Sequence, residues 1–341
     1  MSASLRILVI GGTRFIGLAT VRQLLERGCD VTLFHRGETG ADLLPDIRRI
    51  HGDRGRLADY RAALVAVAPD IVLDMIPLSE ADAIAVMDTF RGIARCVVAV
   101  SSCDVYRAYG RLIGTEPGEP DPVPISESSP LREKRYPYRG RIPGMDEYDK
   151  IPIEHRVLND PDLPGTVLRL PMVYGPRDRQ RRFLRFIKRM ADNRPAILFE
   201  EQEARWRISF AHVEDVANAI ATAIIDPRAA GNIYNVAEPE AAPQIEWARR
   251  IAAATGWSGK LVVLPPDRRL GTGDDDFRQH LVIDSSRIRR ELDYRETVTQ
   301  DEAIRQTVAW EHENPPEKYD AGAFDYATED RLLAEMKGSS R

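Results

Sequence analysis

Short aliphatic runs alternate with helical patterns over the first 100 residues of the chain. The runs that predict strands lie at 5–10, 31–35, 47–51, 71–76 and 96–100, and helical patterns begin near 15, 58 and 80. Strands that are apolar along their whole length and separated by helices are typical of a parallel sheet covered on both faces. The pattern therefore predicts an α/β fold with a Rossmann-type doubly wound parallel sheet, whose ligands bind at the carboxyl ends of the strands.

The pattern is more mixed after residue 100. It predicts strands at 166–170 and 231–236, and helices at 151–158, 181–192, 243–255, 285–292, 300–312 and 324–336. Residues 107–145 show little periodicity and many Pro, Gly, Arg and Tyr residues, which favours a lid-like excursion. We therefore expect an NAD(P)-binding Rossmann domain over 1–175, with 107–145 as a loop excursion. A smaller α/β substrate domain should occupy mainly 176–341, with 205–236 returning to the Rossmann domain.

Composition narrows the class of protein. The 341 residues carry a formal net charge of −5, so no general affinity for polyanions is implied. No apolar run approaches the length of a membrane span, and the N-terminus shows no secretory leader, so we expect a cytoplasmic protein without membrane contact. The three cysteines have no metal-ligand spacing, so we expect reduced thiols and no metal site.

The first predicted strand runs into a glycine turn at Gly11 and Gly12 and then into a helix. Such a turn directs free backbone N–H groups and the positive end of the helix dipole at one place, which suits a pyrophosphate. Gly11 permits the tight turn and Gly17 allows close packing of helix and strand, whereas Arg14 replaces the middle glycine of the usual pattern. The predicted cofactor contacts of this loop are Gly11, Gly12, Thr13, Arg14, Phe15, Ile16 and Gly17.

Residues after the second strand bear on the choice of cofactor. An NAD site usually has an acidic residue there, whereas this chain has His35 and Arg36. Arg36, together with Arg14, would suit a ribose 2′-phosphate, so we expect NADP and leave NAD open, because both arginines could simply be solvated. Asp53 would accept from the adenine amino group or serve a turn. The further predicted cofactor contacts are Arg36, Asp53, Arg54, Met75, Lys150, Pro171 and Met172.

Seven motifs occur in order along residues 5–310. They are Gly-Gly-Thr-Arg-Phe-Ile-Gly at 11–17, Gly-Asp at 52–53, Ser-Ser-x-x-Val-Tyr at 101–106, Lys-x-x-x-Glu at 150–154, Leu-Arg-x-x-x-Val-Tyr-Gly-Pro at 168–176, His-Val-x-Asp-Val-Ala at 212–217 and Tyr-Asn-Val at 234–236. Together they resemble the extended short-chain dehydrogenase/reductases, the NAD(P)-dependent epimerase/dehydratase family. The resemblance implies a Rossmann domain, a smaller substrate domain, nucleotide-sugar-like substrates and, often, homodimers.

The resemblance also implies a catalytic trio of Ser, Tyr and Lys. Ser102 would orient the substrate oxygen and Lys150 would polarise the tyrosine and hold the nicotinamide ribose. Asp146 stands where the family has its tyrosine, four residues before Lys150, and the nearest tyrosine is Tyr148. On a regular helix, residues two apart face away from each other.

Three assignments of the acid/base follow from this departure. Pro152 places Lys150 at the helix entrance, where non-helical dihedrals would let Tyr148 take the role. Asp146 would need strong desolvation to act as a base. A residue of the excursion, such as Tyr136 or Tyr138, is the third candidate.

We therefore expect an NAD(P)-dependent epimerase, dehydratase or reductase that transfers a hydride at a carbinol carbon of a sugar-like or anionic substrate. A nucleotide sugar stays open, because Ile208 stands where the family has an arginine, four residues before His212. The alternative is a cofactor-binding, non-catalytic protein, regulatory or RNA-binding, similar to chloroplast stem-loop RNA-binding proteins. Seven basic residues over 177–189 favour this alternative, and the acidic net charge makes nucleic acid the less expected partner.

Overall fold

The computed structural model describes residues 4–38, 47–271, 273 and 275–339. Its centre is a parallel sheet of seven strands in the order β10-β6-β5-β4-β1-β2-β3. The strands are β1 (Arg6–Ile10), β2 (Asp30–His35), β3 (Arg48–His51), β4 (Ile71–Asp74), β5 (Cys96–Ser102), β6 (Gly165–Leu170) and β10 (Ile233–Asn235). The order reverses between β1 and β4, which is the crevice where doubly wound sheets bind ligands. The predicted fold class is confirmed.

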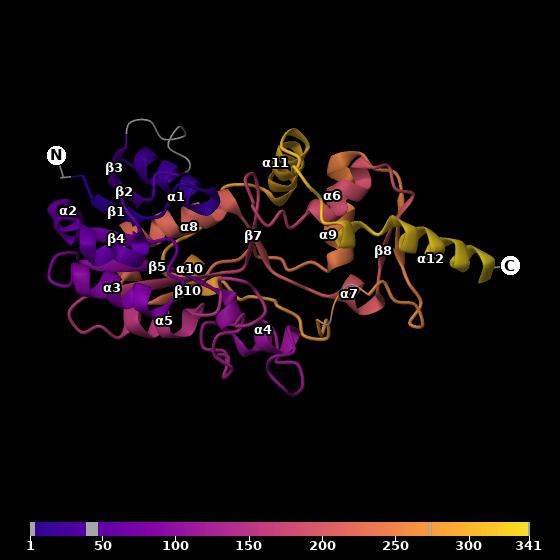
Figure 1. Ribbon diagram of the computed structural model, residues 1–341, viewed down its shortest axis with the longest axis horizontal. Helices are drawn as coiled ribbons and strands as arrows, with labels where there is room; N and C mark the ends of the chain where they lie inside the picture. Colours follow the sequence, from indigo (N-terminus) through magenta and orange to yellow (C-terminus); the bar gives the residue numbers. More distant parts are fainter. Residues whose placement is uncertain (1–3, 39–46, 272, 274, 340–341) are drawn as a thin grey trace.

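Helices cover both faces of this sheet (Figure 1). One face packs against α1 (Phe15–Glu26) and α8 (Val213–Ile225), and the other against α2 (Arg61–Ala66), α3 (Glu80–Phe90) and α5 (Lys150–Leu158). Alternate strand residues serve the two layers, since Ile7 and Val9 join the first core and Leu8 and Ile10 join the second. Burial on both faces explains why the strands are apolar at successive positions.

A second group of elements lies toward the other end of the molecule (Figure 1). It comprises α6 (Leu184–Ala191), α7 (Glu201–Arg205), α9 (Gln244–Thr255) and α11 (Gln300–Glu313), with the parallel pair β8 (Ala196–Phe199) and β11 (Lys260–Val263). The pair β7 (Met172–Tyr174) and β9 (Phe210–His212) lies between this group and the large sheet. The core of this second group is aromatic, with the rings of Tyr174, Phe183, Phe210 and Trp247 in mutual contact.

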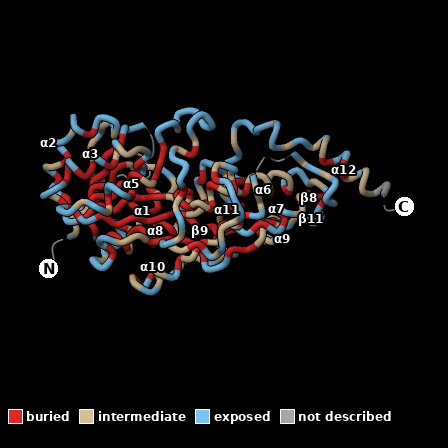
Figure 2. The backbone as a smooth tube through the Cα atoms, turned by 90° about the horizontal axis from the view of Figure 1, so that it is seen from below, coloured by how far each residue is buried: buried red, intermediate tan, exposed pale blue. Residues whose placement is uncertain are grey.

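The remaining elements of the described residues are α-helices and 3-10 helices. They are α4 (Arg107–Leu112), α10 (Ser286–Glu291), α12 (Tyr326–Ser339) and the 3-10 helices η2 (Arg54–Tyr60), η3 (Cys103–Val105), η4 (Pro227–Ala229) and η5 (Ala321–Phe324). Figure 2 shows buried backbone concentrated around the large sheet, while α12 is mostly exposed or intermediate. No helix of the described residues is long and apolar enough to cross a membrane.

Most predicted elements agree with the structure within two residues. The helix predicted at 324–336 is α12, which ends three residues later, at Ser339, and three further elements differ in extent or type. The strand predicted at 71–76 ends at Asp74, whose carboxylate binds Arg54 and the N–H of Ile76. The helix predicted at 58–67 is η2 followed by α2. The helix predicted at 181–192 begins only at Leu184, because Arg181 has φ of 47° and the carboxylate of Asp178 accepts from the N–H of Arg182.

Candidate active site

The glycine loop between β1 and α1 forms a cradle open to solvent. Gly11 and Gly12 have φ of 96° and 88°, and a Cβ atom on Gly17 would lie 2.6 Å from the Cα atom of Gly12. Within the described residues, no side chain caps the N-terminus of α1, where Arg14 is the extended N-cap residue. The free N–H groups of the first helical turn therefore remain available to an anion.

A cavity of about 500 Å³ opens on this loop. All seven predicted loop residues line it, together with Arg36, Asp53, Arg54 and Met75 from the ends of neighbouring strands. The uncapped helix, the glycine cradle and this cavity fit the diphosphate and adenosine half of a nicotinamide dinucleotide.

The charged residues around this cavity differ in the ion pairs and hydrogen bonds that they already make. Arg36 is 61% exposed at its side chain and forms an ion pair of 3.2 Å with Glu38. Arg54 instead binds both carboxylate oxygens of Asp74, at 2.6 and 2.9 Å, and also Asp82, so its charge is used within the protein. Asp53 accepts from the N–H of Gly55 in a turn while it lines the cavity. Arg36 is therefore more available than Arg54 to bind a phosphate.

The structure brings Tyr148 and Lys150 together at the start of α5. Asp149 between them is extended, with φ of −159° and ψ of 120°, and residues two apart along an extended segment point to the same side. The Nζ atom of Lys150 lies 5.5 Å from the ring centroid of Tyr148. Asp146 is exposed and accepts from the N–H of Gly140. Tyr148, rather than Asp146, therefore lies beside Lys150.

Lys150 is buried at the end of the sheet. Its ammonium group donates to the carbonyl oxygens of Pro77, at 2.6 Å, and Val100, at 3.1 Å. Burial lowers the pKa of Lys150 to about 8, while the carboxylates of Asp104 and Asp74 act in the opposite direction. Lys150 therefore titrates close to neutral pH.

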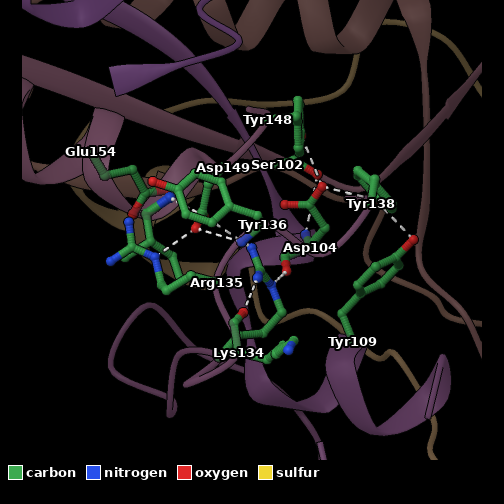
Figure 3. Close-up of polar contacts among 12 residues, drawn as sticks. Ser102, Asp104, Tyr109, Lys134, Arg135, Tyr136, Tyr138, Tyr148, Asp149 and Glu154 are labelled. Carbon is green, nitrogen blue, oxygen red and sulfur yellow. Dashed lines mark hydrogen bonds and ion pairs between the residues drawn. The ribbon is translucent and has the colours of Figure 1, made fainter. Parts of the chain in front are cut away.

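The hydroxyl group of Tyr148 donates to Oδ2 of Asp104 at 2.8 Å (Figure 3). Tyr138, from the excursion, donates to the same oxygen at 3.0 Å, and its hydroxyl also lies 3.0 Å from that of Tyr109. Burial and the Asp104 carboxylate raise the pKa of Tyr148 well above its usual range, opposed by a hydrogen bond with Ser102. Ser102 and Tyr148 therefore meet, and Tyr148 is held in its protonated form.

The excursion is anchored on the residue between Tyr148 and Lys150. Asp149 is fully buried and accepts from Arg132 at 3.2 Å and from Arg135 at 2.6 Å. It also caps α5 by accepting from the N–H of Ile151. No pattern in the sequence marks these contacts, because they join segments that have no common periodicity. They fix the extended turn that aligns Tyr148 with Lys150.

Several motif residues form a buried network behind the candidate site. Glu154 accepts from Arg169 with both oxygens, and Arg169 also donates to the hydroxyl group of Tyr106 at 3.0 Å. Tyr106 donates to Asn235 at 2.6 Å, and Ser101 donates to Glu154. Four of the seven motifs thus meet in one scaffold that connects β5, α5, β6 and β10.

A second cavity, of about 400 Å³, lies against Ser102, Asp104 and Tyr148. Tyr138, Pro171, Met172, Arg182 and Ile208 also line it. Pro171 and Met172, predicted as cofactor contacts, therefore face this cavity. The side chain of Arg207, beside Ile208, donates to the carbonyl oxygen of Ala241. The second cavity is the place where a substrate would meet Tyr148.

The basic stretch at 177–189 is largely neutralised within the protein. Ion pairs join Arg181 to Glu311, Arg182 to Asp178, Arg185 to Glu203, Lys188 to Asp192 and Arg189 to Glu329. Phosphate contacts would have to compete with these acidic partners. No cluster of His, Cys, Asp and Glu in the described part of the chain could hold a metal ion.

Comparison with known proteins agrees with this geometry. The chain is 26% identical over 273 residues to the 2'-dehydrokanamycin reductase of Streptomyces kanamyceticus, which covers 77% of this chain and 70% of that protein. It is 25% identical over 249 residues to the chloroplast stem-loop binding protein of 41 kDa b of Arabidopsis thaliana, covering 69% of this chain and 59% of that protein.

Among solved structures, the Bordetella bronchiseptica enzyme WbmG in complex with NAD has a TM-score of 0.69 at 21% identity, covering 95% of this chain and 97% of that one. The sequence model of the NAD dependent epimerase/dehydratase family matches residues 7–237, which include the glycine loop and the candidate site. The chain therefore belongs to the NAD dependent epimerase/dehydratase family, whose members are nicotinamide-dependent oxidoreductases and epimerases.

Proposed function

We propose that this protein transfers a hydride between NADP(H) and a carbinol or carbonyl carbon of a sugar-like substrate, with Ser102, Tyr148 and Lys150 as its catalytic residues. The observation that carries this proposal is that Ser102 and Tyr148 line the second cavity together, while the Nζ atom of Lys150 lies 5.5 Å from the ring centroid of Tyr148. The bound nicotinamide would supply or accept the hydride. Ser102 would orient the substrate oxygen and Tyr148 would move the proton at that oxygen.

Carbonyl reduction is the direction that the site favours. Tyr148 keeps its hydroxyl proton in the ligand-free protein and donates it in a hydrogen bond to Asp104. Tyr148 can therefore act as an acid. The likeness to a reductase from Streptomyces kanamyceticus supports the same direction. Epimerisation and dehydration would use the same residues after an initial oxidation, for which Tyr148 would have to lose its proton.

The NADP preference rests on Arg36 and Arg14, which line the first cavity beside the second strand. We further propose that residues 1–175 and 205–236 mainly hold the cofactor, while the rest of 176–341 mainly shapes the substrate cavity. A homodimer is part of the same proposal and is supported by the family resemblance. A cytoplasmic location is also proposed, on the basis of the three cysteines, which we expect to be reduced.

The direct test is binding and turnover by the purified protein. Titration with NADPH and NADH, followed by fluorescence, should show saturable binding and a preference for NADPH. Loss of NADPH absorbance with a panel of keto sugars should then identify a reducible substrate. Absence of binding to either nicotinamide cofactor would contradict the proposed function.

An RNA-binding role is the second candidate, favoured by the likeness to the chloroplast stem-loop binding protein. The ion pairs that neutralise the basic stretch weigh against it. Salt-sensitive binding of stem-loop RNA by the wild-type protein would support this candidate instead.

A further inference from the structure

One carboxylate oxygen in the second cavity has no hydrogen-bond partner. Asp104 is 5% exposed, and its Oδ2 atom accepts from both Tyr148 and Tyr138. Its Oδ1 atom is also buried, yet no donor of the described residues reaches it. Figure 3 shows the Asp104 side chain between Ser102, Tyr148 and Tyr138, and all four residues line the cavity. A buried, unpartnered oxygen is costly unless a ligand supplies the missing donor.

The positively charged side chains near this oxygen donate hydrogen bonds to other acceptors. Arg182, which lines the same cavity, donates through its Nη1 atom to the carbonyl oxygen of Val173 at 2.7 Å and to Asp178 at 3.1 Å, while its buried Nε atom has no hydrogen-bond partner among the described residues. Lys150 donates to two backbone carbonyl oxygens at the end of the sheet. The side chain of Arg132 donates to the backbone carbonyl oxygen of Asp104 and to Asp149. Each of these cations therefore has acceptors other than Oδ1.

We propose that Oδ1 of Asp104 binds a protonated amino group of the substrate, close to the oxygen atom that exchanges a proton with Tyr148. This inference rests on the proposed function and names its substrate class as an amino sugar or a similar amine-bearing carbonyl compound. A protonated amine supplies both the missing donor and a charge opposite to that of the carboxylate. A hydroxyl group would supply the donor alone.

Amine binding would also act on Tyr148. The Asp104 carboxylate raises the pKa of Tyr148 by charge and by accepting its hydrogen bond. A positive charge on the other oxygen offsets this effect, so the proton of Tyr148 becomes easier to transfer. Lys150, Tyr109 and Tyr138 also lie close to Tyr148. Substrate binding and acid strength are thereby coupled through one carboxylate.

The test uses the NADP-loaded full-length protein and four matched probes, observed by ligand-detected NMR. The probes are glucosamine, N-acetylglucosamine, glucose and 2-deoxyglucose. Wild-type protein should prefer glucosamine by about tenfold over the other three, as expected for one charge-assisted hydrogen bond. Asp104→Asn should reduce this preference below about twofold, whereas Arg205→Ser, at an exposed residue of α7 that does not line the cavity, should retain it.

Several outcomes would overturn the inference. These are glucose binding as tightly as glucosamine, no preference among the probes, no probe binding at all, or an unchanged preference in Asp104→Asn. Because N-acetylglucosamine removes the charge without a mutation, the test holds even if Asp104→Asn fails to fold. NADPH titration of the same samples separates the two proposals, since intact cofactor binding without amine preference contradicts only this inference.

Discussion

The hydroxyl group of Tyr148 lies 2.8 Å from Oδ2 of Asp104, so a buried carboxylate holds the proton of the candidate acid. A tyrosine beside a lysine alone would lose its proton more readily. Here burial, and after it the Asp104 carboxylate, raises the pKa of Tyr148, so Tyr148 stays protonated in the ligand-free protein.

Replacing Tyr148 by Phe should reduce the rate of carbonyl reduction by roughly 10²–10⁴-fold, because the proton donor is removed. NADPH affinity should change little, since the phenol lies in the second cavity. Steady-state kinetics and fluorescence titration measure the two quantities. Tyr138→Phe is the matched control, because Tyr138 donates to the same Asp104 oxygen and should retain most of the activity. Full turnover by Tyr148→Phe would place the acid elsewhere.

The rate of reduction should fall as the pH rises through about 8, because Lys150 loses its proton there. Below that pH the ammonium group is present to bind ribose and polarise Tyr148. Asp104→Asn removes a carboxylate that raises the pKa of both Lys150 and Tyr148. Its alkaline decline should therefore move to lower pH, as measured by kcat from pH 6 to 10, roughly one unit for each 1.4 kcal/mol of lost interaction. A decline that moves upward or stays in place would contradict this electrostatic account.

Replacing Arg36 by Ser should weaken NADPH binding about tenfold or more, because one charge-assisted contact to the 2′-phosphate is lost. NADH binding should change little, since NADH has no such phosphate. Arg205→Ser is the control, as Arg205 is a highly exposed residue of α7 outside the residues that line the first cavity. Equal losses for the two cofactors, or a wild-type preference for NADH, would exclude this role for Arg36.

Replacing Arg169 by Met should lower the free energy of unfolding by about 3–5 kcal/mol, since it leaves the buried Glu154 carboxylate without its partner. Arg156, in the same helix as Glu154, pairs with Glu80 at the surface. Arg156→Met should therefore cost at most about 1 kcal/mol. Urea unfolding at neutral pH measures both values. Similar losses in the two variants would show that the Glu154 network does not support the scaffold.

Much of the fold was predictable because its signals are local. The aliphatic strands and the Gly11–Gly17 turn depend on residues that are close in sequence, and the large sheet agrees with them. Errors occurred where a distant contact ended an element. Asp74 ends β4 by binding Arg54, and Asp178 delays α6, so a continuous apolar or helical pattern overestimated both elements.

The candidate site was predictable only in part. Ser102 and Lys150 follow from motif spacing, but the place of Tyr148 depends on the extended backbone of Asp149. That conformation is held by Arg132 and Arg135 of the excursion, which lie 17 and 14 residues earlier in the chain. The pattern of residues along a helix carries no information about such contacts.

The sequence by itself determined the parallel sheet, the glycine turn and the family, because strand periodicity and glycine positions are local properties and the order of the motifs can be read along the chain. Only the tertiary structure decided that Tyr148 rather than Asp146 lies beside Lys150, and that Asp104 lines the second cavity. The physical reason is that the excursion folds back onto the start of α5, where the buried Asp149 carboxylate requires its arginine partners. The ion pairs of Asp149 hold its backbone in the extended conformation. That conformation places the side chain of Tyr148 on the same side as Lys150.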